Sequence, residues 1–209
     1  MKNGRAAIVS ILIIGTSVLL LSLYDNYHSK YNLTPWLSTS PVYFLNKAES
    51  ELRKKHLFNA KSYIEKAIYC MHTIDEYALG ESKEYVDVSV NRLKNLIVKI
   101  DQRMSPQEEL QYAYFQAVNT VAYSELIISE KEFQIGKRHE SLKLLKTVLS
   151  LLNDSMEYQI SSSDVKSAEL RIIEQVSELI THLEQRKVLD ANQCDIVKVE
   201  LQNLLNTLI

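Results

Sequence analysis

Hydrophobic side chains follow two different patterns along this chain. Residues 6–24 (AAIVSILIIGTSVLLLSLY) form one apolar run that no charged residue interrupts. Beyond residue 41, apolar residues instead recur every three or four positions, which is the period of a helix with one buried face. The sequence therefore predicts an all-α protein, in which a single N-terminal transmembrane helix precedes an antiparallel helical-hairpin or bundle domain of about seven helices.

The apolar run is long enough to cross a membrane, since a helical span needs about 20 residues. Lys2 and Arg5 precede it and Asp25 follows it. The positive-inside rule therefore keeps residues 1–5 in the cytoplasm and places the larger domain on the periplasmic or extracytoplasmic side. A secretory signal that is cleaved would send the domain to the same side, but the run ends without the small residues of a cleavage site. We expect an uncleaved anchor, followed by a juxtamembrane linker over residues 25–41.

The helical domain is expected to occupy residues 42–209. Breaks in the apolar period divide it into two units, each a hairpin followed by a third helix, at about 42–103 and 107–187. A closing helix is expected at about 190–208. None of these helices is apolar all round, so none is predicted to be a second membrane span.

Local residues set the expected helix ends. Ser40 and Pro41 are typical of the N-cap and first position of a helix, and Gly80 is typical of the residue that follows a helix end. The segment SPQE at residues 105–108 predicts a capping box at the start of the longest helix, with Glu108 reaching back to the cap.

A second feature is a repeated packing pattern on the second helix of each hairpin. The pattern consists of Ala60, Ile64 and Ala67 in the first unit and Gly136, Ser141, Leu145 and Val148 in the second. Small residues let a neighbouring helix approach, and a large apolar residue fills the next groove. On these residues the chain resembles tetratricopeptide-type helical hairpins, and its layout is similar to that of the YfdX family. The resemblance implies an exported all-helical protein with a stress-related or chaperone-like role, and it carries over no catalytic residue.

Composition narrows the function classes. The chain has 209 residues but only 4 glycines and 3 prolines, which argues against β-sandwiches, barrels and dinucleotide-binding folds. The formal net charge of −2 provides no basic footprint, so we expect no nucleic-acid partner.

Candidate chemistry is sparse. The five histidines are scattered, and the pair Cys70 and His72 would point in nearly opposite directions on a helix. We therefore predict no catalytic residue, no cofactor and no metal site. Cys70 and Cys194 are either two buried thiols or, in an oxidising compartment, one disulfide.

Tyrosine is frequent, with 12 copies, and Tyr112, Tyr114 and Tyr123 cluster on one predicted helix. Because tyrosine buries a large area at low entropic cost, these three are the candidate partner surface. The sequence thus favours a membrane-anchored, non-enzymatic scaffold or adaptor domain that binds a protein partner, with homo-oligomerisation left open. The alternatives are a YfdX-like stress or chaperone factor, and a ligand carrier or enzyme with an interhelical cavity.

Overall fold

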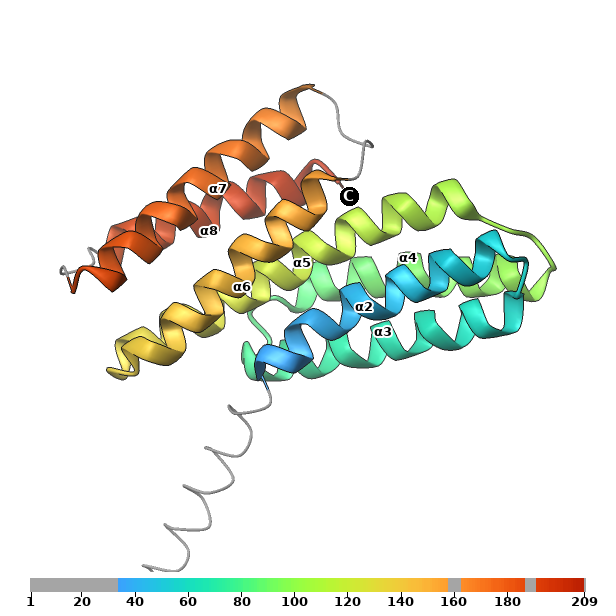
Figure 1. The fold of residues 1–209 in the computed structure, drawn as a ribbon, viewed down its shortest axis with the longest axis horizontal. Coiled ribbons are helices and arrows are strands. Elements are labelled where there is room, and N and C mark those ends of the chain that lie inside the picture. The colour runs from blue at the N-terminus through green and yellow to red at the C-terminus, as the bar shows by residue number, and fades with distance from the viewer. Residues whose placement is uncertain (1–33, 158–162, 187–190, 209) are drawn as a thin grey trace, which may run out of the picture. The chain divides into compact units, whose positions relative to one another are not determined.

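The computed structural model describes residues 34–157, 163–186 and 191–208. These residues form seven α-helices and no strand, which confirms the predicted all-α class and the number of helices (Figure 1). The helices are α2 (Thr34–Arg53), α3 (Leu57–Tyr77), α4 (Lys83–Asp101), α5 (Gln107–Gln134), α6 (Arg138–Met156), α7 (Ser163–Glu184) and α8 (Ala191–Asn206). The predicted anchor at residues 6–24 lies outside the described residues. None of the helices that are described combines the length and apolar character of a membrane span.

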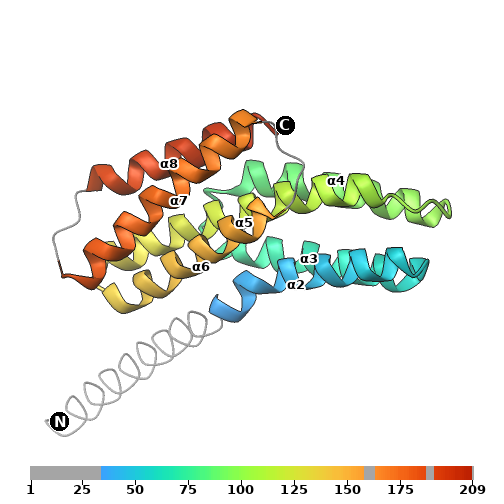
Figure 2. The same cartoon turned by 45° about the horizontal axis from the view of Figure 1, so that its top comes forward.

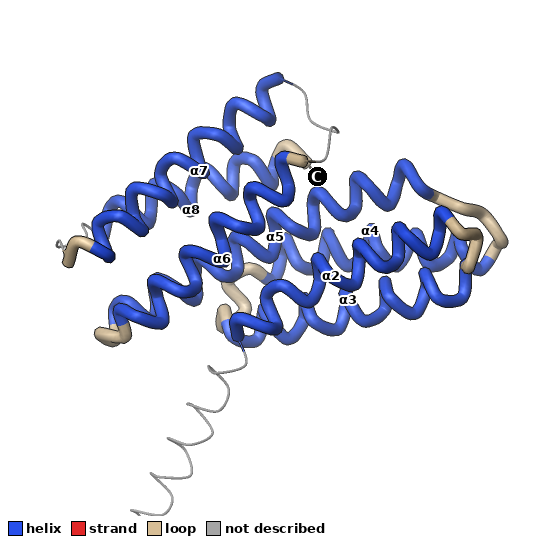
Figure 3. The backbone as a smooth tube through the Cα atoms, viewed as in Figure 1, coloured by secondary structure: helices blue, strands red, loops and turns tan. Residues whose placement is uncertain are grey.

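Successive helices run antiparallel, and short turns join most of them (Figure 3). Helix α5 is the common neighbour, because it packs against α3, α4, α6 and α8. Helix α7 packs against α6 and against α8. Helix α2 lies beside α3 (Figure 2). The rings of Phe44 on α2 and Tyr63 on α3 stack with centroids 6.4 Å apart.

The central position of α5 is visible in its burial. Every residue from Ala113 to Ser129 is buried, so this helix has no solvent face over that stretch. Its buried polar and charged residues are Gln116, Asn119, Thr120, Ser124, Glu125, Ser129 and Glu132. The sequence predicts helices with one buried face, whereas the neighbouring helices cover both the apolar and the polar sides of α5.

The turns between helices use one recurrent C-terminal cap. In five helices the residue after the C-cap has a positive φ: Lys55, Leu79, Arg103, Gly136 and Arg186. At the end of α3, the amide of Leu79 donates to the carbonyl of Glu76 at 3.2 Å, and the amide of Gly80 donates to that of Asp75 at 3.0 Å. This pair of hydrogen bonds is a Schellman motif. Leu79, and not the predicted Gly80, therefore takes the position directly after the cap.

Two predicted helix starts are wrong. Helix α2 begins at Thr34, so Pro41 lies inside it, and the linker predicted to extend to residue 41 is helical from residue 34 onward. Proline lacks an amide donor, so it fits the first turn of a helix best and costs about 3 kcal/mol in the interior. The burial of Val42, Leu45 and Ala48 offsets this cost in α2. Helix α5 begins at Gln107 with Pro106 as its N-cap and no side-chain cap, so the capping box does not form.

Candidate functional site

The largest of the surface depressions described lies between α4 and α5. It has a volume of about 630 Å³. The lining residues are Arg92, Asn95, Leu96, Val98, Lys99 and Gln102 from α4, and Glu109 and Tyr112 from α5. Both walls are regular helices, so the side chains that line this α4–α5 groove are held on rigid backbone.

One end of the α4–α5 groove is built around Arg92. Its guanidinium carbon lies 4.4 Å from the ring centroid of Tyr112, which is a cation–π contact. Both terminal nitrogens of Arg92 donate to the backbone carbonyl of Leu208 at 3.2 Å, and the hydroxyl of Tyr112 donates to the same oxygen at 3.2 Å. The amide of Gln116 reaches it at 3.5 Å. The chain that follows α8 is therefore fastened beside the groove by donors from two helices.

The other end of the groove carries opposite charges. Lys99 and Glu109 form an ion pair at 2.7 Å across the two helices, and the hydrogen bond from Lys99 holds the pKa of the Glu109 carboxyl below its ordinary value. Between the ends, Leu96 is buried and Val98 is 54% exposed. The groove thus offers a partly exposed apolar strip flanked by hydrogen-bonding groups, which is suited to binding a chain segment.

Two smaller depressions border α7 and α8. One has a volume of about 400 Å³ and is lined by Asp164, Val165, Ala168, Arg171, Glu200, Asn203, Leu204 and Thr207. The other has a volume of about 180 Å³ and includes Gln175 and Ile196. Gln175 donates to Glu200 at 3.2 Å, and this contact ties the two helices together between the depressions.

A buried polar cluster joins α5, α6 and α7. The hydroxyl of Ser155 donates to the carboxylate of Glu169 at 2.5 Å, and the amide of Asn119 donates to the Ser155 hydroxyl at 2.8 Å. Glu169 is completely buried, and this burial raises the pKa of its carboxyl, although the hydrogen bonds from Ser155 and Asn119 act in the opposite direction. The cluster lies inside the helical packing, so its chemistry serves to connect helices.

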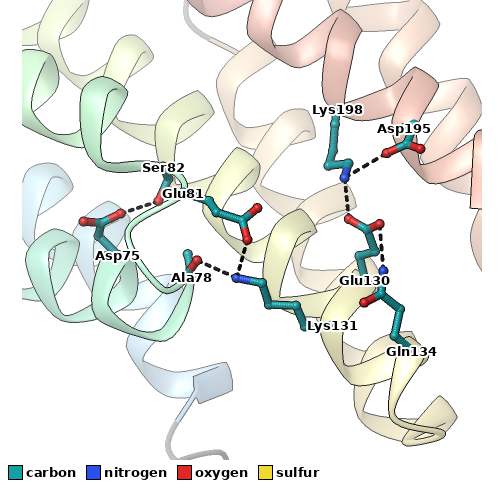
Figure 4. A network of polar contacts seen from close by, with 9 residues as sticks. All are labelled: Asp75, Ala78, Glu81, Ser82, Glu130, Lys131, Gln134, Asp195 and Lys198. Carbon is teal, nitrogen blue, oxygen red and sulfur yellow. Dashed lines mark hydrogen bonds and ion pairs between the residues drawn. The ribbon is translucent and has the colours of Figure 1, made fainter.

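Charged contacts on the flank of α5 are shown in Figure 4. The ammonium of Lys198 on α8 contacts the carboxylate of Glu130 at 2.5 Å and that of Asp195 at 2.9 Å. Burial lowers the pKa of Lys198, but its hydrogen bonds to the two carboxylates outweigh that effect and raise the pKa overall. The next residue of α5, Lys131, pairs with Glu81 at 2.8 Å. These contacts attach α5 to α8 and to the α3–α4 turn.

The predicted tyrosine surface is not an exposed surface. Tyr114 is 2% exposed and Tyr123 is 4% exposed, because both lie on the enclosed stretch of α5. Tyr123 packs edge-on against Tyr85 at 5.3 Å and accepts a hydrogen bond from Gln202 at 2.6 Å. Tyr112 alone of the three lies at a groove. The prediction that these three residues form one partner surface is therefore wrong.

The residues of the predicted packing pattern lie in helix contacts. Ala60, Ile64, Ala67, Ser141, Leu145 and Val148 are all buried. Ser141 exchanges a hydrogen bond with Ser129 of α5 at 3.0 Å. Gly136 has a φ of +82°, so it serves the turn before α6 and not a helix contact.

Both cysteines are buried and unpaired, which answers the question that the sequence left open. Burial raises the pKa of each thiol, to about 11 for Cys194. Within the described ranges there is no group of three or more His, Cys, Asp or Glu side chains that could hold a metal ion.

Sequence reasoning did not select Arg92, Lys99 or Glu109. A signal was present, since these charged residues flank the apolar positions of their helices, but charged residues beside an apolar stripe are usually only solvated. Comparison with protein-family models, with curated proteins and with solved structures finds no match to the chain. The resemblance to tetratricopeptide-type hairpins and to the YfdX family stays a prediction.

Proposed function

We propose that this chain is a protein-interaction domain, held on the outer side of the cytoplasmic membrane by residues 6–24, which binds a segment of a partner protein in the α4–α5 groove. The observation that carries the proposal is the groove itself: an apolar strip between rigid helices, with a stacked arginine and tyrosine at one end. Arginine and tyrosine are among the residues that most often dominate protein–protein binding energy.

The lining of the groove indicates the chemistry of the partner segment. Val98 presents an exposed apolar side chain above the buried Leu96, which suits an aliphatic or aromatic side chain of the partner. A guanidinium has five N–H donors, and Arg92 uses two of its nitrogens on the carbonyl of Leu208. Further donors remain for a carbonyl or carboxylate of the partner. We therefore expect a segment that places an apolar side chain near an acidic or amide side chain.

The experiment compares two valines with the same exposure on different helices. Val98 in the groove is 54% exposed, and Val199 on α8 is 52% exposed. A photoreactive amino acid is placed at either position in the full chain, and native membranes are irradiated. We expect a discrete adduct with one protein from position 98 and none from position 199. Adducts of equal yield at both positions, or none at position 98, would overturn the proposal.

Substitutions at the same two positions test the groove without photochemistry. Val98→Glu puts a charge on the apolar strip, and Val199→Glu is its matched control. Both positions are exposed, so both variants are expected to keep the helical circular dichroism of the parent. Their free energies of unfolding in urea should stay within about 0.5 kcal/mol of the parent value. Copurification of the crosslinked partner should fall about tenfold or more for Val98→Glu only, a loss of at least 1.4 kcal/mol of binding.

A second candidate function is client binding of the chaperone type. It is favoured by exposed apolar side chains outside the groove, among them Phe58 at 83% and Tyr69 on the same helix. A domain of this kind would suppress the aggregation of a heat-labile enzyme, and the double variant Phe58→Ser and Tyr69→Ser would lose that effect. Suppression that is absent, or that survives this double substitution, would exclude these residues as a client surface.

A further inference from the structure

Helices α2 and α3 carry a surface patch of aromatic rings and lysines, which we call the aromatic–lysine patch. Its members are Tyr43, Phe44, Lys47, Tyr63 and Lys66. The rings are in contact, with centroids 5.4 Å apart for Tyr43 and Phe44 and 6.4 Å apart for Phe44 and Tyr63. The ammonium of Lys47 lies 5.5 Å from the Tyr43 ring, and that of Lys66 lies 5.1 Å from the Tyr63 ring and 5.9 Å from the Phe44 ring.

The patch is exposed. The side chain of Tyr43 is 55% exposed, both lysines are exposed, and Phe44 and Tyr63 are half-buried. Aromatic side chains of this size usually contribute to a core, so three of them in one continuous surface contact need another explanation.

The two lysines give the patch a positive charge that its own neighbours do not neutralise. Within the part of the chain that the structure describes, the contacts given for Lys47 and Lys66 are with rings and not with carboxylates. Two of the nearby acidic groups are engaged elsewhere: Glu49 pairs with Arg53 at 2.7 Å, and Glu51 pairs with Lys54 at 2.9 Å.

The position of the patch in the chain points to its occupant. Helix α2 begins at Thr34, and the apolar run ends at residue 24. The ten Cα–Cα steps from residue 24 to residue 34 can span at most about 36 Å when fully extended. A chain that is anchored through residues 6–24 therefore keeps the start of α2 within that distance of the lipid headgroups.

We propose that the aromatic–lysine patch binds the headgroup region of an anionic phospholipid bilayer, with the rings among the glycerol and acyl boundary and both ammonium groups on lipid phosphates. Tyrosine rings are enriched at the membrane–water interface, because one end of the ring is apolar and the other is polar. Lysine lays its aliphatic chain along apolar surface while its ammonium stays at the phosphate level. Each lysine near an anionic surface strengthens binding about fivefold. The closeness of the patch to the bilayer rests on the proposed anchorage at residues 6–24, whereas its ring and lysine chemistry does not.

The test measures how deep the patch lies in the bilayer. The full chain is reconstituted in vesicles of phosphatidylcholine with a quarter of phosphatidylglycerol. A nitroxide is attached at Tyr43→Cys or, as the control of equal exposure, at Val199→Cys. Cys70 and Cys194 are buried with raised thiol pKa values, and the unsubstituted chain checks that they do not label. We expect the ratio of oxygen to nickel-chelate accessibility to be severalfold higher at position 43 than at position 199.

The charge requirement is tested with Lys47→Glu and Lys66→Glu together. This double variant should bring the accessibility ratio at position 43 down to that at position 199, and its circular dichroism should stay unchanged because both side chains are exposed. Hydrogen exchange of α2 and α3 provides a readout without a label: we expect slower exchange with phosphatidylglycerol than with phosphatidylcholine alone. Equal accessibility at positions 43 and 199, together with exchange that does not depend on lipid charge, would overturn the inference.

Extraction with alkaline carbonate separates this inference from the proposed function. A chain that stays in the membrane fraction while position 43 is as water-exposed as position 199 contradicts the patch and leaves the anchor intact. A chain that carbonate releases contradicts the anchor. If the released chain still shows slower exchange in α2 and α3 with anionic vesicles, the patch stands without the anchor.

Discussion

The guanidinium of Arg92 stacks on the ring of Tyr112 at 4.4 Å, and both side chains donate to a single backbone oxygen, that of Leu208. This arrangement joins α4, α5 and the chain after α8, which are separated by up to 116 residues in the sequence. The stack fixes the plane of the guanidinium, so its two nitrogens reach the carbonyl together. A lysine at this position could not provide the same paired contact.

We therefore expect Arg92→Lys to loosen the end of α8. The variant should exchange the amide hydrogens of residues 201–208 faster than the parent and lose about 1–2 kcal/mol of unfolding free energy, because hydrogen bonds from a charged group are lost. Tyr112→Phe, which keeps the ring under Arg92, should lose about 1 kcal/mol or less. Exchange in α8 that is unchanged in Arg92→Lys would show that this contact does not hold the helix.

The positive φ of Leu79 leads to a prediction about the turn between α3 and α4. A residue with a side chain pays about 1–2 kcal/mol to adopt the left-handed region, and Leu79 is 74% exposed, so its side chain gains little in return. Leu79→Gly should raise the unfolding free energy by about 0.5–1 kcal/mol, measured by urea unfolding of the full chain in detergent.

Gly136 provides the opposite control, since it occupies the same cap position at the end of α5 with a φ of +82° and has open space around it. Gly136→Ala should lower the unfolding free energy by about 1 kcal/mol through backbone strain alone. If both substitutions destabilise the protein, side-chain contacts of Leu79 outweigh its backbone strain.

Glu169 should make stability depend on pH. Burial raises the pKa of its carboxyl above the ordinary 4.5, so the folded state holds a proton that the unfolded state releases. The contribution of this group is therefore fully present below pH 4.5 and is lost as the pH rises through the pKa of the folded state, with a slope of at most about 1.4 kcal/mol per pH unit. Glu169→Gln cannot ionise but can still accept the hydrogen bond from Ser155. We expect urea midpoints of this variant to fall less between pH 5 and 8 than those of the parent, and parallel curves would contradict this assignment.

The ion pair between Lys198 and Glu130 should show measurable coupling. Both side chains are largely shielded from water, with exposed fractions of 19% and 17%. A double-mutant cycle with Lys198→Met and Glu130→Gln should give a coupling free energy of about 1–2 kcal/mol. The exposed pair of Lys83 and Asp87 is the matched control and should give less than about 0.5 kcal/mol. Equal coupling in the two cycles would mean that burial adds nothing to the contact between α8 and α5.

The helices of this protein were predictable from sequence because their apolar period and their interruptions are strong. The closing helix predicted at about 190–208 agrees with α8 at Ala191–Asn206. Starts were harder: Pro41 has the properties of a first helical residue, yet α2 continues through it from Thr34. Proline is tolerated at the first position and disfavoured in the interior because it removes a backbone hydrogen bond, so the local sequence favoured the wrong place.

The environment of α5 could not be predicted from its own residues. Asn119 and Glu125 are of residue types that usually face solvent, but both are fully buried. Whether such a residue faces water or a partner such as Ser155 depends on helices that are distant in the sequence. The same limit applies to Tyr114 and Tyr123: their residue type suits a binding surface, but the surrounding helices enclose them.

The polar residues of α5 also determine how its neighbours can be arranged around it. Rotating α5 by one residue would turn Asn119 away from Ser155 by about 100° and break the hydrogen bond between them. A purely aliphatic surface would tolerate such a rotation, because apolar contacts are not directional. Matching donors and acceptors thus select a single register for α6, α7 and α8 along α5.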